Sequence, residues 1–187
     1  MIQNGKSMKT ITAKWYECSI RYEKVDESGA SKMVTESYVV DALSFTEAES
    51  ILIENVSPLT NGAFDVVGIK QAKYNEVALM TDGEAILHHE TNKLMHAMQV
   101  GKGEEQFKEH TEFNRAMVES HFYKVKVAFV TLDEKTGKEK MTNTLMLIEG
   151  CSLHVALDGV DNVLQGTMVD YISVNAASTN IVDVFVH

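Results

Sequence analysis

Histidine and glutamate side chains are concentrated between positions 84 and 112 of the sequence. The cluster contains Glu84, His88, His89, Glu90, His96, Glu109, His110 and Glu112. Imidazole and carboxylate groups on two facing helices can bind a metal ion. The segment has neither Glu-x-x-His nor His-Glu-x-x-His spacing, however, and histidines beside an apolar stripe are usually solvated. We therefore expect an exposed helix face here, and no metal or other cofactor.

Two serines, Ser44 and Ser152, have the chemistry of a nucleophile but stand at the start of predicted helices. Ser44 can accept a hydrogen bond from a free backbone N–H, and Glu47 can reach back to the cap, which explains these residues without catalysis. Neither serine belongs to a pattern with His and Asp, and the sequence contains no Gly-rich phosphate loop. The sequence therefore predicts that the protein is not an enzyme.

The elements that position these residues repeat along the chain. The alternating apolar positions of the first predicted strand recur 107 residues later, so that Tyr16, Cys18, Ile20 and Tyr22 correspond to Tyr123, Val125, Val127 and Phe129. Alternation of period two indicates a strand with one buried face. One extra loop residue in the second copy then aligns Val40-Asp41-Ala42 with Ile148-Glu149-Gly150. Further along, Asp65 is aligned with Asp170 and Asn75 with Asn180, and the chain is predicted to be a tandem duplication.

Each copy is predicted to contain two strands, a helix and a third strand. The fold class is therefore α+β, with two antiparallel ββαβ units and a helical hairpin inserted between them. The predicted parts are an N-terminal tail at 1–10, a first unit at 11–79, the insert at 80–120 and a second unit at 121–187.

Two features of these units follow from single residues or short runs. The third strand is expected to be long in both units, at 64–79 with a bend at Gly68, and at 167–185. The helix of the second unit is expected to be the weaker one, because Gly159 in its interior costs about 1 kcal/mol relative to Ala.

The insert carries an apolar stripe at helical spacing, formed by Leu87, Leu94, Met95 and Met98. A pair of short helices buries too little apolar surface to be stable alone, so this stripe must pack on something. It would either pack on the two sheets as a clamp between the copies or contact another subunit, since methionine side chains adapt to irregular partners. We expect a contact with another subunit, because the duplicated units should close their cores without help.

Charge and composition exclude several classes of protein. The formal net charge is −10, and Arg21 and Arg115 are the only arginines, which argues against a partner bound chiefly through phosphates. Nucleic acid is therefore an unlikely partner. The two cysteines have no metal-ligand spacing, and no apolar run approaches the roughly 20 residues of a membrane span. We expect a reduced, cytoplasmic protein with no membrane association.

Two aromatic residues fall out of phase with the buried faces of the first strands. Trp15 and Phe122 occupy the same place in the two copies and are expected to be exposed. Together with Arg21, Lys124 and Lys126 they are the predicted contacts for a ligand or partner. Two alternatives use these residues: a binder that sequesters a nucleotide-like molecule, and an accessory protein for single-stranded nucleic acid.

Several blocks of the sequence resemble one uncharacterised family found in gut-bacterial genomes and their phages. They are Trp15-Tyr16-Glu17, the run from Val39 to Glu49 with its Val-Asp-Ala-Leu-Ser-Phe-Thr-Glu-Ala-Glu core, the run from Thr131 to Lys140, and Asp183-Val184-Phe185. The insert departs from the family pattern, in which a short linker joins the two copies. The resemblance implies a phage or mobile-element setting and brings no activity. We therefore predict a non-enzymatic accessory protein that acts through protein contacts, either as a homo-oligomer or as an inhibitor of a host protein.

Overall fold

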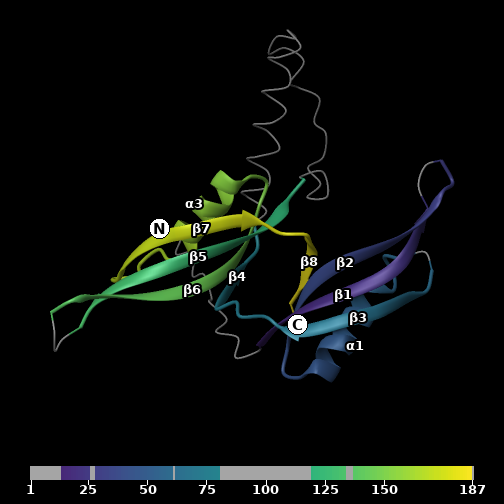
Figure 1. Ribbon diagram of the computed structural model, residues 1–187, viewed down its shortest axis with the longest axis horizontal. Coiled ribbons are helices and arrows are strands. Elements are labelled where there is room, and N and C mark those ends of the chain that lie inside the picture. The colour runs from purple at the N-terminus through teal and green to yellow at the C-terminus, as the bar shows by residue number, and fades with distance from the viewer. Residues whose placement is uncertain (1–13, 26–27, 61, 81–118, 134–136, 187) are drawn as a thin grey trace, which may run out of the picture. The chain divides into compact units, whose positions relative to one another are not determined.

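The computed structural model of the 187-residue chain describes residues 14–25, 28–60, 62–80, 119–133 and 137–186. In this part of the chain the fold is mixed α+β, as predicted. It contains two four-stranded sheets, with helices α1 (Phe45–Val56) and α3 (Leu153–Val163) packed against them (Figure 1). The predicted helical hairpin lies outside the described residues.

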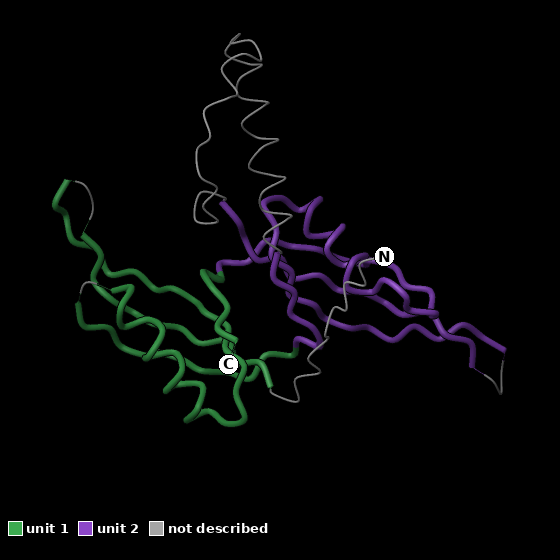
Figure 2. Tube along the Cα trace, turned by 180° about the vertical axis from the view of Figure 1, so that it is seen from behind, with its two compact units in different colours: residues 1–73, 181–187 green, residues 74–180 purple. Residues whose placement is uncertain are grey.

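The chain forms two compact units, which Figure 2 shows in green and purple. Unit 1 consists of residues 1–73 and 181–187. Its sheet has the order β3-β1-β2-β8, with bounds β1 Lys14–Val25, β2 Ser31–Ala42, β3 Phe64–Gln71 and β8 Ile181–Phe185. Strand β1 pairs antiparallel with β2 and β3, while β8 pairs parallel with β2.

Unit 2 consists of residues 74–180 and has the corresponding sheet order β4-β6-β5-β7. Its strands are β4 Glu76–Ala78, β5 His121–Leu132, β6 Glu139–Gly150 and β7 Asp170–Ser178. Strand β5 pairs antiparallel with β6 and β7, while β4 pairs parallel with β6. The two sheets are thus mixed rather than purely antiparallel.

The prediction of one long third strand in each copy is wrong. The first ends where the Ala72 N–H donates to the Trp15 carbonyl at 2.8 Å, and the second where the Thr179 N–H donates to the Phe122 carbonyl at 2.9 Å. After each break the chain enters the other sheet, as β4 or as β8. The compact units therefore differ from the predicted boundaries 11–79 and 121–187.

The strand registers also correct part of the sequence alignment. Phe64 pairs with Tyr22 on β1, and Tyr171 pairs with Phe129 on β5, so Phe64 corresponds to Tyr171. Asp65 then corresponds to Ile172, not to Asp170. The pairing of each edge strand shifts register at the same place. In unit 1 the shift of β3 follows Ser19 of β1, and in unit 2 the shift of β7 follows Lys126 of β5. The extra loop residue is present as expected, because Trp15 pairs with Asp41 and Phe122 with Glu149.

Each helix packs on the face of its sheet that the alternation predicts to be buried. In unit 1 the core contains Tyr16, Cys18 and Ile20 from β1, with Tyr22 half-buried at its edge. In unit 2 it contains Tyr123, Val125 and Val127, and Phe129 is half-buried. Burial raises the pKa of the Cys18 thiol to about 11, so this thiol stays protonated at neutral pH and is a poor nucleophile.

Serine caps begin both helices, as predicted. The Ser44 Oγ accepts from the Glu47 N–H at 3.1 Å, and the Ser152 Oγ accepts from the Val155 N–H at 3.3 Å. The Glu47 carboxylate reaches one residue beyond the cap, because it accepts from the Leu43 N–H at 2.8 Å. Both serines are therefore occupied by structural hydrogen bonds.

Gly159 has a packing role that the sequence analysis did not anticipate. A Cβ at this position would lie 2.8 Å from Cγ2 of Ile148 on β6. The missing side chain is what lets α3 approach the sheet closely, whereas the equivalent position in α1 is Ile51, a buried core residue. The helical cost of this glycine is therefore offset by contact with β6.

We expect Ile20→Ala and Val127→Ala each to lower the free energy of unfolding by about 1–4 kcal/mol, because both side chains are fully buried at equivalent places. Urea denaturation followed by circular dichroism measures the change. Thr35→Ala, at an exposed position on β2, is the control and should stay within about 0.5 kcal/mol. Changes of that small size at both core positions would contradict the assigned strand faces.

We expect Gly159→Ala to destabilise the protein by about 1–2 kcal/mol, since overpacking against Ile148 outweighs the gain in helix propensity. In an Ile148→Ala background the obstructing methyl group is gone. The same substitution should then stabilise by up to about 1 kcal/mol. Thermal unfolding of the four proteins of this double-mutant cycle measures the coupling, and purely additive effects would contradict the steric explanation.

Candidate functional site

The predicted contact residues all lie on the outer face of the sheets, meaning the face opposite the helix. Trp15 and Arg21 alternate with the core residues of β1, and Phe122, Lys124 and Lys126 alternate with those of β5. Arg21 and Lys126 are exposed, and Trp15 and Lys124 are half-buried. The expectation that Phe122 is exposed is wrong, because only 4% of this residue is accessible.

The burial of Phe122 has a physical basis that alternation cannot show. The outer-face residue Leu147, next to the pair of Phe122 and Glu149 on β6, is also fully buried, as is its counterpart Val39 in unit 1. Both faces of the sheet are therefore buried at this end. A period-two pattern identifies which residues share a face, but it does not say whether the second face is solvated.

The five predicted contacts are divided between the two units. Trp15 and Arg21 belong to unit 1, and the other three belong to unit 2. Six residues along a strand correspond to about 20 Å, so Trp15 and Arg21 are also distant from each other. The Lys124 ammonium lies over the Tyr74 ring, 5.3 Å from its centroid. The predicted subunit contacts Leu87, Leu94, Met95 and Met98 lie outside the described residues.

The outer faces of the two units differ in chemistry although their scaffolds correspond. In unit 1 the Glu17 carboxylate forms an ion pair with Lys70 at 2.5 Å, and Arg21 stands opposite Asp65. In unit 2 the residues at the places of Arg21 and Asp65 are Ala128 and Ile172, which pair with each other. At these two places the outer face of unit 2 thus has apolar side chains where unit 1 has charged ones.

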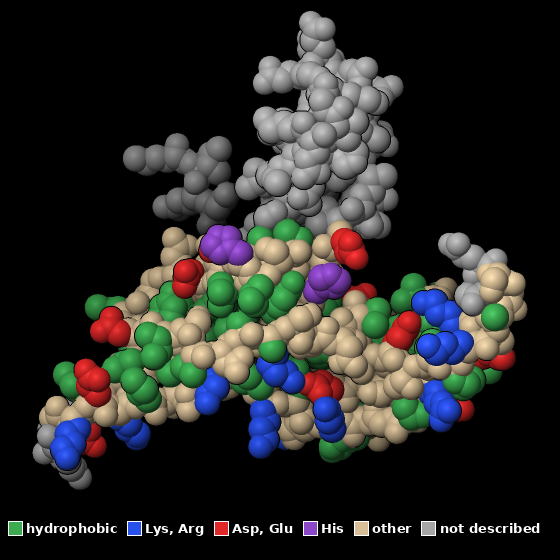
Figure 3. All heavy atoms as spheres, turned by 45° about the horizontal axis from the view of Figure 1, so that its top comes forward, with side chains coloured by type: hydrophobic (Ala, Val, Ile, Leu, Met, Phe, Trp, Pro, Cys, Tyr) green, Lys and Arg blue, Asp and Glu red, His purple; other side chains and the backbone are tan. Residues whose placement is uncertain are grey.

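The most exposed apolar side chains of this face form what we call the arm patch: Leu132, Met141 and Ile172, with half-buried Val130 among them. The exposed fractions of the first three are 70%, 56% and 49%. Val130 pairs with Met141, and the pair of Ala128 and Ile172 is the next row of the sheet. Figure 3 shows, for one face of the molecule, that hydrophobic side chains are exposed beside charged ones.

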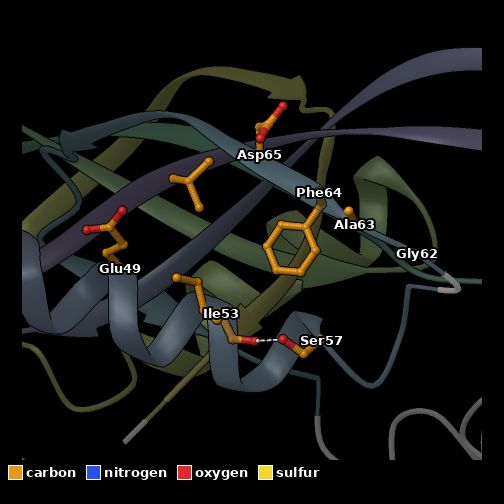
Figure 4. A pocket seen from close by; sticks show the side chains of 8 residues that line it. Glu49, Ile53, Ser57, Gly62, Ala63, Phe64 and Asp65 are labelled. Atoms are coloured by element: carbon orange, nitrogen blue, oxygen red, sulfur yellow. Dashed lines mark hydrogen bonds between the residues drawn. The ribbon is translucent and has the colours of Figure 1, made fainter.

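Unit 1 has a second candidate site, a groove between α1 and β3 with a volume of about 500 Å³. Glu49, Ile53 and Ser57 line it from α1, Gly62 and Ala63 from the loop, and Phe64, Asp65 and Val66 from β3 (Figure 4). The Phe64 ring extends toward Ile53, and the Ser57 hydroxyl donates to the Ile53 carbonyl at 2.6 Å. The groove therefore has an apolar floor and falls in the usual size range of ligand sites.

This groove and its counterpart in unit 2 differ in the position of one tyrosine hydroxyl group. In unit 1 the cross-strand pair is Tyr22 and Phe64, and the hydroxyl is on β1, where it donates to Glu36 at 2.8 Å. In unit 2 the pair is Phe129 and Tyr171, and the hydroxyl is on the edge strand.

The Tyr171 hydroxyl donates to Asp161 of α3 at 3.0 Å, so a hydrogen bond crosses between the helix and the edge strand of unit 2. Ile53 and Phe64, which occupy the corresponding places in unit 1, cannot form it. The gap between helix and edge strand is thus bridged in unit 2 and left open in unit 1.

Carboxylates hold the phenols of both arrangements in their protonated form. Tyr38 also donates to Glu36, at 2.9 Å. Burial, followed by the hydrogen bond to Glu36, raises the pKa of Tyr38 and of Tyr22. The hydrogen bond to Asp161 is the main cause that raises the pKa of Tyr171. These tyrosines therefore act as hydrogen-bond donors throughout the neutral range.

Two buried acids, Asp41 and Glu149, occupy equivalent places that the sequence analysis aligned without assigning a role. Glu149 accepts hydrogen bonds from the Met80 N–H at 2.9 Å and from the Ser120 hydroxyl at 2.8 Å. Its carboxylate thus joins two positions forty residues apart in the chain, and its role is structural. The sequence pattern that could have indicated this role is an acidic residue at the apolar end of both β2 and β6.

No group of three His, Cys, Asp or Glu side chains in the described ranges is placed to hold a metal ion, and the histidine-rich segment 84–112 lies outside these ranges. Among the helices that the structure describes, none is both long enough and apolar enough to cross a membrane.

The two units thus share an α+β fold with one element order and diverge at their surfaces. Two stretches of the chain, residues 14–88 and 78–187, match the model of one family, which is described as a domain of unknown function (DUF4494). Together these matches cover most of the chain, and the protein belongs to this family. A comparison with curated proteins gives no match.

We expect Glu149→Ala to lower the free energy of unfolding by about 2–4 kcal/mol, because it leaves the Met80 N–H without its buried acceptor and removes a second hydrogen bond. Glu149→Gln keeps one acceptor oxygen and should cost less. Urea denaturation measures both variants. Equal stability of Glu149→Ala and the parent protein would show that these hydrogen bonds are replaced by water.

Proposed function

We propose that the protein is a non-enzymatic accessory protein of a phage or mobile element, and that it acts through protein–protein contacts made by the arm patch of unit 2. The observation that carries the proposal is the exposure of Leu132, Met141 and Ile172 on three neighbouring strands around Val130, on one face of the sheet. Contiguous exposed apolar side chains are typical of interaction surfaces. The phage or mobile-element setting rests on the sequence blocks described above.

Unit 1 provides an internal comparison for this surface. We infer that the units are copies of one ancestral ββαβ unit, since their sheets have the same order, their pairs correspond, and one family model matches twice. In unit 1 the places of Val130 and Ile172 hold Glu23 and Asp65. The places of Leu132 and Met141 are also apolar and exposed in unit 1, where they hold Val25 and Met33. The copies therefore differ at the places of Val130 and Ile172, where unit 1 has acids. Apolar side chains at these places in unit 2 are more readily explained by a partner than by folding, because unit 1 folds without them.

A second copy of the chain is the partner to test first. Its unit 1 presents Glu17, Glu23 and Asp65 on the same scaffold where unit 2 presents Lys124 and Lys126. Charges of opposite sign on the two outer faces favour a head-to-tail contact between chains over a contact of one face with itself.

The alternative ligands have less support. A nucleotide-like molecule needs accessible aromatic faces, and Phe122 does not offer one. Single-stranded nucleic acid requires a basic surface, whereas the net charge of the chain is −10. The protein-contact proposal uses side chains that are exposed.

We expect Leu132→Lys combined with Met141→Lys to weaken self-association by about 100-fold or more, since each apolar side chain contributes about 1.5 kcal/mol or more when fully buried at an interface. Light scattering after size-exclusion chromatography, over a range of protein concentrations, measures the association.

The matched control is Leu43→Lys combined with Leu59→Lys, which changes two exposed apolar positions next to the ends of α1 and not on the outer face of either unit. This variant should associate like the parent protein. A parent protein that stays a single chain at all concentrations would refute self-association, and equal loss in both variants would refute the assignment to unit 2.

A further inference from the structure

The groove of unit 1 lies beside a strand that has one free edge. Strand β3 is at the end of the sheet order, so within the described residues it pairs with β1 on one side only. The backbone N–H and C=O groups on its other side are available to an added strand. Helix α1 and β3 together thus offer a ladder of hydrogen-bonding groups next to an apolar depression.

We propose that this groove binds an extended segment of a partner protein, and that the segment has an apolar–basic–apolar sequence. The site does not involve the arm patch, and it shares only Asp65 with the acidic outer face of unit 1 described above. An extended peptide that adds to β3 gains main-chain hydrogen bonds from the strand and selectivity from the pockets for its alternate side chains.

The apolar positions follow from the side chains that face the helix. Phe64 and Val66 point toward α1 and pack at the edge of its core, and Ile53 is exposed on the facing helix. Residues of a peptide opposite Phe64 and Val66 would place their side chains on the same face, because successive side chains of a strand alternate. Two apolar side chains, one residue apart, would therefore enter the groove.

The basic position follows from Asp65, which lies between those two residues and is exposed on the outer face. Arg21 is its cross-strand neighbour on β1, yet no ion pair among the described residues includes Asp65. A lysine on the free side would stand directly opposite its carboxylate, where opposite charges stabilise a strand pair.

The length of the segment is limited by the irregularity of β3. The pairing register shifts at Val67, between the pairs Ser19 with Gly68 and Ile20 with Val66. A bulge of this kind interrupts the straight edge and prevents long pairing between sheets. The edge therefore suits a short segment next to residues 62–66, and it disfavours continuous edge-to-edge aggregation.

Unit 2 shows how the same site is closed. Tyr171 and Asp161 bridge its helix and edge strand, Ile172 replaces the carboxylate of Asp65, and Val169 stands where Gly62 leaves the groove open. The protein thus contains an open groove in unit 1 and a closed groove at the corresponding place in unit 2. Exchanging the residues that distinguish them gives a direct test.

The experiment is a titration of the isotope-labelled full chain with the blocked tripeptide Val-Lys-Val, followed by amide chemical shifts. We expect shifts at residues 49–57 and 62–66, and none at 157–173. The tripeptide Val-Glu-Val should bind about fivefold more weakly than Val-Lys-Val, because its carboxylate would face the carboxylate of Asp65. Shifts centred elsewhere, or equal affinity for the two peptides, would overturn the proposal.

The decisive variant is Phe64→Tyr combined with Ile53→Asp, which installs the bridge of unit 2 in unit 1. It should reduce Val-Lys-Val binding at least about tenfold, while Glu54→Gln, on an exposed part of α1, should leave binding unchanged. If the bridged variant does not fold, Asp65→Asn serves instead and should abolish the preference for lysine over glutamate. Retained binding in the bridged variant would refute the site. Peptide-free shifts that depend on protein concentration at both 49–57 and 62–66 would also refute it, because they would assign the groove to a second copy.

Discussion

Each sheet depends on a strand that comes from far along the chain. Strands β2 and β6 would be edges if the units contained only their own local elements, and their backbone groups at the buried end would then lack partners. Parallel pairing with β8 and with β4 satisfies them. Because an unpaired buried backbone group costs about as much as a lost hydrogen bond, this exchange determines where the chain can break and turn. The ends of β3 and β7, and the transfer of the chain between sheets, follow from it.

The exchange of β4 and β8 between the sheets also explains where polar side chains are tolerated in the interior of the protein. Asp41 and Glu149 lie at the ends of the strands that receive the exchanged partners. In unit 2 the Glu149 carboxylate accepts hydrogen bonds from the Met80 N–H, two residues after β4, and from the Ser120 hydroxyl, one residue before β5. It thus provides hydrogen-bond acceptors for the chain segments on either side of the insert. A buried acid with satisfied hydrogen bonds is stable in such a place, and an apolar residue would leave the Met80 N–H unpaired.

Much of the local structure was predictable from the residues alone. The phase of β1 and β5, the serine caps and the extra loop residue follow from rules that act over a few positions, and the structure agrees with each. The strand exchange was not predictable. The apolar positions change phase between Ile69 and Ala72, which indicates a break in the strand, but a change of phase does not show which sheet the chain enters next. The burial of Phe122 and the need for Gly159 were missed for a related reason. Both depend on what lies across the sheet or helix, and periodicity within one element does not report that.

The late position of β8 has a consequence for synthesis of the protein. The other elements of unit 1 all come from the first 71 residues, yet the strand that completes its sheet emerges only after the whole of unit 2 has been made. On the ribosome, β2 must therefore remain an unprotected edge, with Tyr38 still lacking the Phe185 ring that stacks on it at 5.5 Å. In unit 2 the parallel strand β4 precedes the strands it joins, and the last strand to be made is β7, which is separated from β8 by two residues. Both sheets are therefore completed at the same late stage of synthesis, but only unit 1 keeps β2 open as an edge while the whole of the other unit is made.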